Sequence, residues 1–257
     1  MGETVGISRD ARGVATVTLS RPEKHNAMSA GMIAELRAAA EELGADEGVR
    51  VVVLTGAGRS FCAGGDLGWM REQMAADGAQ RASEARKLAE MLGAWDRVPK
   101  PVIGRVQGDA FGGGVGLISV CDVAVAVEGA RFGLTEVRLG LIPATIGPYV
   151  AARIGKSLAR RVFFSGRLFG AEEAVTLGLL RRAVAEGDLD AAVEEEVAPY
   201  LAAAPGAVAE AKALLASFGG EDDVARSIEA LVARWESTEA EEGTGAFFAK
   251  RKADWVS

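Results

Sequence analysis

The chain has 257 residues, of which 49% are hydrophobic and 25% charged, so it can bury the core of a sizeable globular protein. Its formal net charge of −7 argues against a broad nucleic-acid-binding face, because phosphate binding requires a concentration of Lys and Arg. Two cysteines, Cys62 and Cys121, are too few for a disulfide framework and lack metal-ligand spacing, which excludes disulfide-rich, zinc and iron–sulfur classes.

The N-terminal segment lacks the basic-then-apolar pattern of a secretory signal. Every long apolar run in the chain is interrupted before it reaches membrane-spanning length. We therefore expect a cytoplasmic protein with no membrane partner.

The chain begins with a predicted β-hairpin followed by a helix. Residues 14–19 alternate with the two-residue period of a half-buried strand, and a turn at residues 10–13 pairs them with residues 4–9. Ser29 is placed to cap the helix that follows. The apolar residues on one face of this helix are Met32, Ile33, Leu36, Ala40 and Leu43.

The middle of the chain predicts alternating strands and helices. Residues 49–56 and 102–108 read as short apolar strands that are buried on both faces, and a polar helix over 79–97 separates them. Three consecutive glycines, 112–114, then precede a short apolar helix and a strand over 123–127. This repetition of strand, glycine turn and helix is typical of α/β layer proteins with functional loops at the strand ends.

Beyond Gly155 the sequence predicts helices almost throughout. They cover residues 157–164, 171–178, 188–204, 206–218 and 222–242. We place an approximate domain boundary between Pro199 and Pro205, which divides a core of residues 1–200 from a helical region of residues 201–257. We expect this second region to cap the fold or to meet a partner subunit.

Two glycine-rich turns follow predicted strands and precede predicted helices. One is "SFCAGGDL", residues 60–67, and the other contains Gly112, Gly113 and Gly114. Glycine allows a substrate to approach the backbone closely, and the first N–H groups of a helix have no intrahelical acceptor. One N–H from each turn can therefore hold a carbonyl oxygen that becomes an enolate, which is an oxyanion hole.

Both turns also have structural explanations. Glycine-rich turns after strands occur in α/β proteins for packing alone, and Asp66 can be a helix N-cap. A dinucleotide site is a rival interpretation, but "GGGVG" lacks the G-x-G-x-x-G spacing and no suitable acidic residue follows. Neither turn establishes a function by itself.

Five segments form one ordered pattern along the chain. They are "RPEKHNAM", "SFCAGGDL", "VQGDAFGGGVGLISVCDVAVA", "RFGLTEVRLGLIPATIG" and "FFAKRK". Together they resemble the enoyl-CoA hydratase/isomerase (crotonase) family over nearly the whole chain. The resemblance implies an α/β fold, a crotonase-type spiral of repeated ββα units with a helical C-terminal region. It also implies assembly as a homotrimer or as a dimer of trimers.

The resemblance implies a site for an acyl-CoA thioester. The N–H groups of Ala63 and Gly113 would form the oxyanion hole, and Glu136 would be the catalytic acid/base. The residues that would border the CoA are Lys24, His25, Ala27, Ala63, Asp66, Leu67, Phe247 and Lys250. Phe247 and Lys250 would approach the CoA of a neighbouring subunit. No metal or further cofactor is required, because CoA arrives as part of the substrate.

The chain departs from the family pattern at one position. Hydratases of the family often carry one glutamate shortly after the glycine triplet and a second in the "FG..E" segment. Here Gly116 occupies the first position and Glu136 the second. A glutamate in "LTEVRLG" can be a solvated side chain near a helix start. If it instead faces the acyl pocket, Leu134, Leu141 and Ile142 would raise its pKa and suit it to acid/base chemistry.

For the other polar residues the sequence supports only weaker functional predictions. His25, the single histidine, lies in a polar loop, which favours an exposed or CoA-edge position over a catalytic triad. Arg138 can hold a substrate carboxylate or can simply be an exposed arginine. We expect Asp122 to be structural and assign no nucleophilic role to Cys62 or Cys121.

Two reactions are compatible with one carboxylate. The run "EVRLGLIPATIGPYVAARIG" most resembles bacterial methylglutaconyl-CoA hydratase-like members, which favours hydration of a branched or carboxylated 2-enoyl-CoA. The alternative is a 3-enoyl-CoA to 2-enoyl-CoA isomerase with Glu136 as the sole proton shuttle. An RNA-binding role is disfavoured, because no clear basic stripe with interleaved aromatic residues is present. A non-enzymatic acyl-CoA-binding role is disfavoured by Glu136, since an inert binder would not need this carboxylate.

Overall fold

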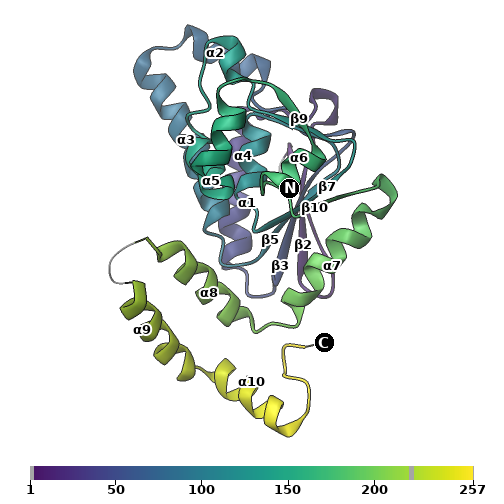
Figure 1. The fold of residues 1–257 in the computed structure, drawn as a ribbon, viewed down its shortest axis with the longest axis vertical. Coiled ribbons are helices and arrows are strands. Elements are labelled where there is room, and N and C mark those ends of the chain that lie inside the picture. The colour runs from purple at the N-terminus through teal and green to yellow at the C-terminus, as the bar shows by residue number, and fades with distance from the viewer. Residues whose placement is uncertain (1–2, 220–222, 257) are drawn as a thin grey trace.

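The computed structural model describes residues 3–219 and 223–256 (Figure 1). Two sheets form its centre. The larger sheet contains, in spatial order, β1 (Val5–Arg9), β2 (Val14–Leu19), β3 (Val51–Gly56), β5 (Val102–Val106), β7 (Val123–Val127) and β10 (Arg182–Val184). The smaller sheet contains β4 (Ser60–Cys62), β6 (Asp109–Phe111), β8 (Arg131–Gly133) and β9 (Leu168–Gly170).

The strand order reveals a repeated unit. Each of the pairs β3/β4, β5/β6 and β7/β8 contributes its first strand to the larger sheet and its second to the smaller sheet before the chain turns helical. Neighbouring strands are parallel except for β1 with β2 and β8 with β9. The predicted α/β spiral of ββα units is therefore confirmed.

Helices cover the sheets and extend beyond them. They are α1 (Ala30–Ala45), α2 (Leu67–Ala75), α3 (Gly78–Asp96), α4 (Gly113–Ser119), α5 (Gly147–Phe163), α6 (Ala171–Thr176), α7 (Leu189–Leu201), α8 (Pro205–Ser217), α9 (Asp223–Trp235) and α10 (Thr238–Ala249). Short 3₁₀ turns are η1 (Pro22–Lys24), η2 (Glu136–Leu139) and η3 (Glu186–Asp188). None of the helices, over the residues described, is long and apolar enough to cross a membrane.

The N-terminal half follows the predicted local rules. The Ser29 hydroxyl accepts a hydrogen bond from the Met32 N–H at 3.2 Å and caps α1, whose predicted apolar face is buried. Every residue of β3 is buried, because this strand lies inside the larger sheet between β2 and β5. The Glu35 carboxylate on α1 accepts N–H groups at the start of β1 and joins the hairpin to the helix.

The structure differs from the sequence-based prediction in its shortest elements. The strands β8, β9 and β10 have three residues each, which is too short for a period to show in the sequence. The helix predicted over 222–242 is two helices, because Ser237 caps α10 by accepting the Ala240 N–H at 3.2 Å. Residue 222 lies outside the described residues.

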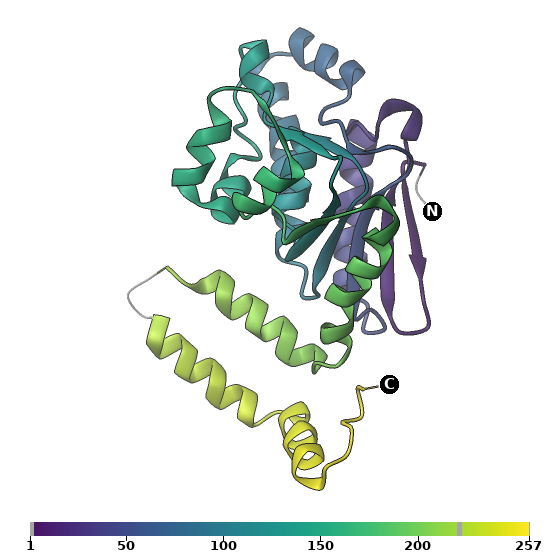
Figure 2. The same ribbon diagram turned by 45° about the vertical axis from the view of Figure 1, so that its right-hand side comes forward.

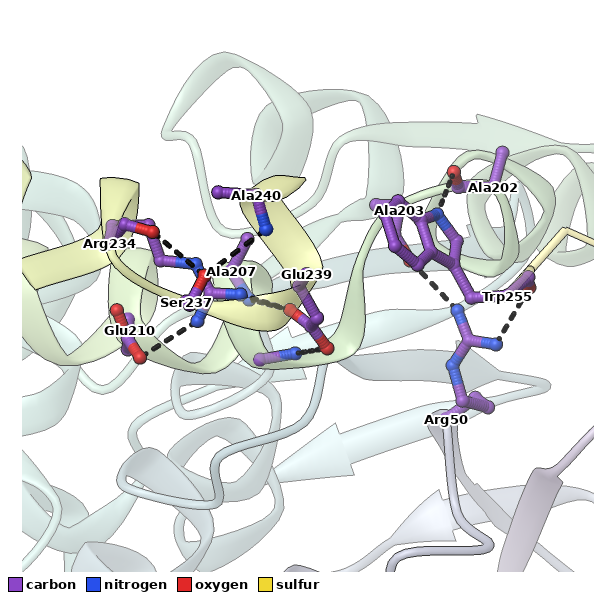
Figure 3. Close-up of polar contacts among 11 residues, drawn as sticks. Arg50, Ala202, Ala203, Ala207, Glu210, Arg234, Ser237, Glu239, Ala240 and Trp255 are labelled. Carbon is purple, nitrogen blue, oxygen red and sulfur yellow. Dashed lines mark hydrogen bonds and ion pairs between the residues drawn. The ribbon is translucent and has the colours of Figure 1, made fainter. Parts of the chain in front are cut away.

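The helices α8, α9 and α10 form an arm that projects from the sheets, and both views show it at the opposite end from α2 (Figures 1 and 2). Lys212 of α8 pairs with Asp122 at 2.7 Å, and Asp122 also accepts the Val102 N–H at 2.7 Å. Asp122 is thus structural, as predicted. Arg50 donates to the Ala203 carbonyl at 2.8 Å and to the Trp255 carbonyl at 3.1 Å (Figure 3).

Within the arm, Glu239 of α10 caps α8 across space. Its carboxylate accepts the N–H groups of Gly206 and Ala207 at 2.9 and 3.1 Å, and Arg234 of α9 also contacts it (Figure 3). Arg234 donates in addition to Glu210 of α8 at 2.8 Å. Because one carboxylate holds two otherwise unpaired helix-start donors, these contacts fix the three helices as one unit.

We expect Glu239→Ala to lower the free energy of unfolding by about 1–3 kcal/mol, because it leaves two backbone donors and Arg234 without their carboxylate. Chemical denaturation monitored by circular dichroism measures this loss. Glu241→Ala is the matched control, since Glu241 is exposed in the same helical turn; it should change stability by no more than about 0.5 kcal/mol. Equal losses in the two variants would contradict the capping role.

Candidate active site

The glycine triplet lies where β6 ends and α4 begins, and its first residue, Gly112, has an unusual backbone conformation. Gly112 has φ +48°, a conformation that residues with a side chain rarely adopt. A Cβ atom there would also lie 3.0 Å from Glu136 Oε1. Gly112 therefore brings the backbone at the start of α4 directly beside the predicted acid/base.

The next two glycines allow α4 to approach other segments. A Cβ atom on Gly113 would lie 2.8 Å from the Met28 Cε. One on Gly114 would lie 2.4 Å from the Cys62 carbonyl oxygen, which is closer than real Cβ contacts allow. The backbone at the start of α4 thus packs directly against the backbone at the end of β4, next to the second glycine turn.

The second turn lies against the first. Gly64 has φ +91°, and a Cβ atom on it would lie 3.0 Å from the Phe111 carbonyl oxygen and 3.8 Å from the Gly113 nitrogen. The Gly64 carbonyl accepts the Met28 N–H at 2.7 Å, and the Met28 carbonyl accepts the Asp66 N–H at 2.9 Å. The two turns predicted from the sequence are therefore brought together.

The hydrogen bonds correct one predicted donor. The Ala63 N–H donates to the His25 carbonyl at 2.9 Å, so this donor is already used within the protein. Met28 and Gly65 form a parallel bridge, in which the N–H of Gly65 points away from the partner segment. Over residues 3–219 and 223–256, neither the Gly65 N–H nor the Gly113 N–H donates to another protein group. The available pair is thus Gly65 and Gly113.

Glu136 begins η2, beside Gly112. Its Oε2 is buried without a hydrogen-bond partner in the described structure, and burial raises the pKa of the carboxyl above its usual range. The predicted direction of this shift is confirmed, but its expected surroundings are only partly right. Leu134 is buried, whereas the side chains of Leu141 and Ile142 are 53% and 72% exposed.

Gly116 is buried within α4, at the position where hydratases of the family pattern often carry a glutamate. A Cβ atom on it would lie 2.7 Å from Ile146 Cγ2 and 3.5 Å from Leu92 Cδ1. Both of these side chains are buried. The space for a side chain at position 116 is therefore filled by hydrocarbon, and Glu136 is the carboxylate that faces the glycine turns.

The predicted CoA-bordering residues fall into two groups. Lys24, His25 and Ala27 lie on the loop before α1, next to the turn that carries Asp66 and Leu67. Among them, Ala27 is buried, Lys24 and Leu67 are exposed, and His25 Nδ1 lies 3.0 Å from the Ser60 hydroxyl. Backbone hydrogen bonds between His25 or Met28 and residues 63, 64 and 66 hold these two segments side by side.

Asp66 has the structural role that its sequence position allowed. Its carboxylate caps α2 by accepting the Gly68 N–H at 2.8 Å, and it pairs with Arg21 at 2.9 Å. Asn26 is a residue that sequence reasoning missed. It has φ +54°, and its side chain donates to the carbonyls of Ala57 and Ser60, which fixes the loop against β4. The available signal was the tolerance of asparagine for this left-handed conformation.

The second group, Phe247 and Lys250, lies apart from the glycine turns. Both residues are exposed at the end of α10, on the arm that projects away from α2 (Figure 2). One chain by itself does not bring them to the site. The cysteines take no part either, because burial raises the pKa of Cys62 and Cys121 to about 12 and keeps both thiols protonated.

The sequence and the fold are both similar to those of known proteins. A sequence profile described as enoyl-CoA hydratase/isomerase matches residues 9–257. A putative enoyl-CoA hydratase of Thermus thermophilus is 36% identical over 246 residues, covering 93% of this chain and 95% of that protein. The crystal structure of an enoyl-CoA hydratase from Shewanella pealeana is 37% identical with a TM-score of 0.94, covering 98% of this chain and 96% of its own.

Another solved structure, Pseudomonas aeruginosa AtuE, also has a TM-score of 0.94 and 37% identity, covering 99% of this chain and 100% of its own. Sequence similarity at this level extends across the sheets, the glycine turns and the C-terminal arm together. The chain belongs to the enoyl-CoA hydratase/isomerase family, whose members have the crotonase fold.

Proposed function

We propose that this protein hydrates 2-enoyl-CoA thioesters reversibly, with Glu136 as its acid/base. The observation that carries the proposal is the position of Glu136. Its Oε1 faces Gly112, one residue before the Gly113 donor, and its Oε2 is buried with no hydrogen-bond partner among the described residues. The carboxyl group thus lies beside the place where the thioester oxygen would bind.

The two backbone donors supply the first part of the mechanism. The N–H groups of Gly65 and Gly113 hold the thioester oxygen, which draws electrons from C3 and acidifies C2. Negative charge then develops on that oxygen as the enolate forms, and each donor contributes about 3–4 kcal/mol to the barrier reduction.

One carboxylate can complete the addition of water. Ionised Glu136 accepts a proton from water as the water oxygen bonds to C3 and the enolate forms. The protonated carboxyl then delivers that proton to C2, which restores the thioester carbonyl and the carboxylate. A raised pKa favours this exchange, since it brings the proton affinity of the carboxyl closer to the working pH.

We propose a branched or carboxylated 2-enoyl group, such as methylglutaconyl, as the substrate. The support is the resemblance of the segment that follows Leu134 to methylglutaconyl-CoA hydratase-like proteins. Arg138 is exposed and packs its side chain against Gly166.

The contact between Gly116 and Ile146 favours one second candidate. With hydrocarbon in place of another carboxylate, Glu136 alone can take a proton from C2 of a 3-enoyl thioester and return it at C4. This is the 3-enoyl-CoA to 2-enoyl-CoA isomerase reaction. It uses the same oxyanion donors and differs only in the absence of water from the product.

We also propose that the chain assembles as a homotrimer or a dimer of trimers. The support is a set of exposed apolar side chains on the arm, whose burial by a second copy would be favourable. They are Leu215, Phe218, Ile228, Leu231, Val232, Trp235, Phe247 and Phe248. In such an assembly Phe247 and Lys250 would reach a neighbouring site.

Mass spectrometry of products formed in deuterated water separates the two reactions. We expect 2-enoyl-CoA substrates, including methylglutaconyl-CoA, to gain one water, and Glu136→Gln to reduce turnover about 10²- to 10⁴-fold. The control is a melting temperature of the variant that is no lower than that of the wild type near neutral pH. Migration of the double bond in a 3-enoyl substrate without added water would give the isomerase first place, and full turnover by Glu136→Gln would refute both mechanisms.

The raised pKa of Glu136 also predicts a dependence of stability on pH. Because the folded state holds this proton more tightly than the unfolded state, the contribution of the carboxyl to stability is greatest at low pH. It is lost as the pH rises through the folded-state pKa. The free energy of unfolding of the wild type should therefore fall relative to Glu136→Gln as the pH rises from 4 to 8. The opposite slope would show that the charged form is the one stabilised.

Packing around Gly116 gives a further prediction. Gly116→Ala should destabilise the fold by about 1–3 kcal/mol, because the new methyl group overlaps Ile146. Combining it with Ile146→Ala should cost less than the sum of the two single changes, which denaturation of all four proteins would measure. Gly78→Ala is the control, since no atom lies within 4 Å of a Cβ there. Simple additivity would contradict the contact.

A further inference from the structure

Trp69 lies beside one of the two proposed oxyanion donors. Its ring atoms Cζ3 and Cε3 are 3.5 and 3.6 Å from the position of a Cβ on Gly65. Trp69 belongs to the first turn of α2, and its N–H donates to the Asp66 cap at 3.3 Å. The indole therefore lies against the backbone of Gly65, next to this proposed donor.

The helix that carries Trp69 is not held by a buried face. No residue of α2 is fully buried, and the half-buried Trp69 ring packs against the hydrophobic core from its edge, so contacts outside this packing also help to set the orientation of the ring. The polar contacts between α2 and α3 are accordingly important. Arg81 of α3 donates to the carbonyls of Gln73 and Met74 at the end of α2, and Glu84 of α3 accepts the Trp69 Nε1–H at 3.4 Å near its beginning.

Glu84 is well placed to hold the indole. Its side chain is 14% exposed, and its second oxygen accepts from Lys87 Nζ at 2.5 Å. Lys87 also holds the pKa of Glu84 below its usual range, although a glutamate of ordinary pKa is already an ionised acceptor near neutral pH. The side chain of Lys87 is 58% exposed and is therefore the outer member of this row of three residues.

We propose that Glu84 is a positioning residue for the reaction, because it fixes the Trp69 ring beside the Gly65 N–H. The fixed ring excludes water from the thioester oxygen and limits the paths open to the acyl group. If Glu84 is removed, the ring can turn away, and the bound thioester loses its reactive alignment even though its CoA part still binds. This inference rests on the proposed use of Gly65 as an oxyanion donor.

Steady-state kinetics with crotonyl-CoA tests the role of Glu84. We expect Glu84→Ala to lower kcat at least tenfold while KM changes less than threefold, since alignment and not CoA binding is lost. Glu84→Gln should retain most activity, because its amide oxygen still accepts the indole N–H. Lys87→Met is the matched control and should stay within threefold of the wild type. A kcat of Glu84→Ala equal to that of the wild type would overturn the proposal.

A binding measurement keeps this test separate from the identity of the reaction. Addition of unreactive butyryl-CoA should change the tryptophan fluorescence of the wild type and of Glu84→Gln. The change should be absent in Trp69→Phe and smaller in Glu84→Ala, whose melting temperature should stay within about 2 °C of the wild type. Equal fluorescence changes in the wild type and Glu84→Ala would refute the role of Glu84, whereas absence of any enoyl-CoA conversion by the wild type would refute the proposed function alone.

Discussion

The site depends on a contact between two stretches of backbone that side chains would prevent. The Gly114 Cα packs against the Cys62 carbonyl, and Gly64 packs against the Phe111 carbonyl. These contacts bring the end of β4 to the beginning of α4, the helix that follows the neighbouring strand β6. Each ββα unit supplies only half of this arrangement, so the spiral of units is what forms the site.

The same contact determines which backbone polar groups near the site are used within the protein and which N–H group is left available. The loop before α1 uses the donors and acceptors of residues 63, 64 and 66 for its own attachment, through His25 and Met28. Alternation of direction along the extended backbone leaves the donor of residue 65 pointing the other way. Glu136 adds a carboxyl group to the candidate site from a third segment, and burial raises the pKa of this group.

Much of this could be predicted from the sequence, because turns and caps are local. The Ser29 and Asp66 caps, the buried β3 strand and both glycine turns follow from neighbouring residues. The choice between Ala63 and Gly65 could not be predicted, since it depends on which N–H faces the distant His25 loop. The packing of Ile146 against Gly116 was also inaccessible, as 30 residues separate them and no local pattern joins them.

The contact between Gly116 and Ile146 also restricts the routes by which this sequence can change. A glutamate cannot enter position 116 while Ile146 occupies the adjoining space without overpacking the core. The order of substitutions is therefore constrained: residue 146 must first become small, at the cost of a cavity, before a carboxylate can be accommodated. In this sequence a carboxylate at position 116 is accordingly reached only through an intermediate of lower stability.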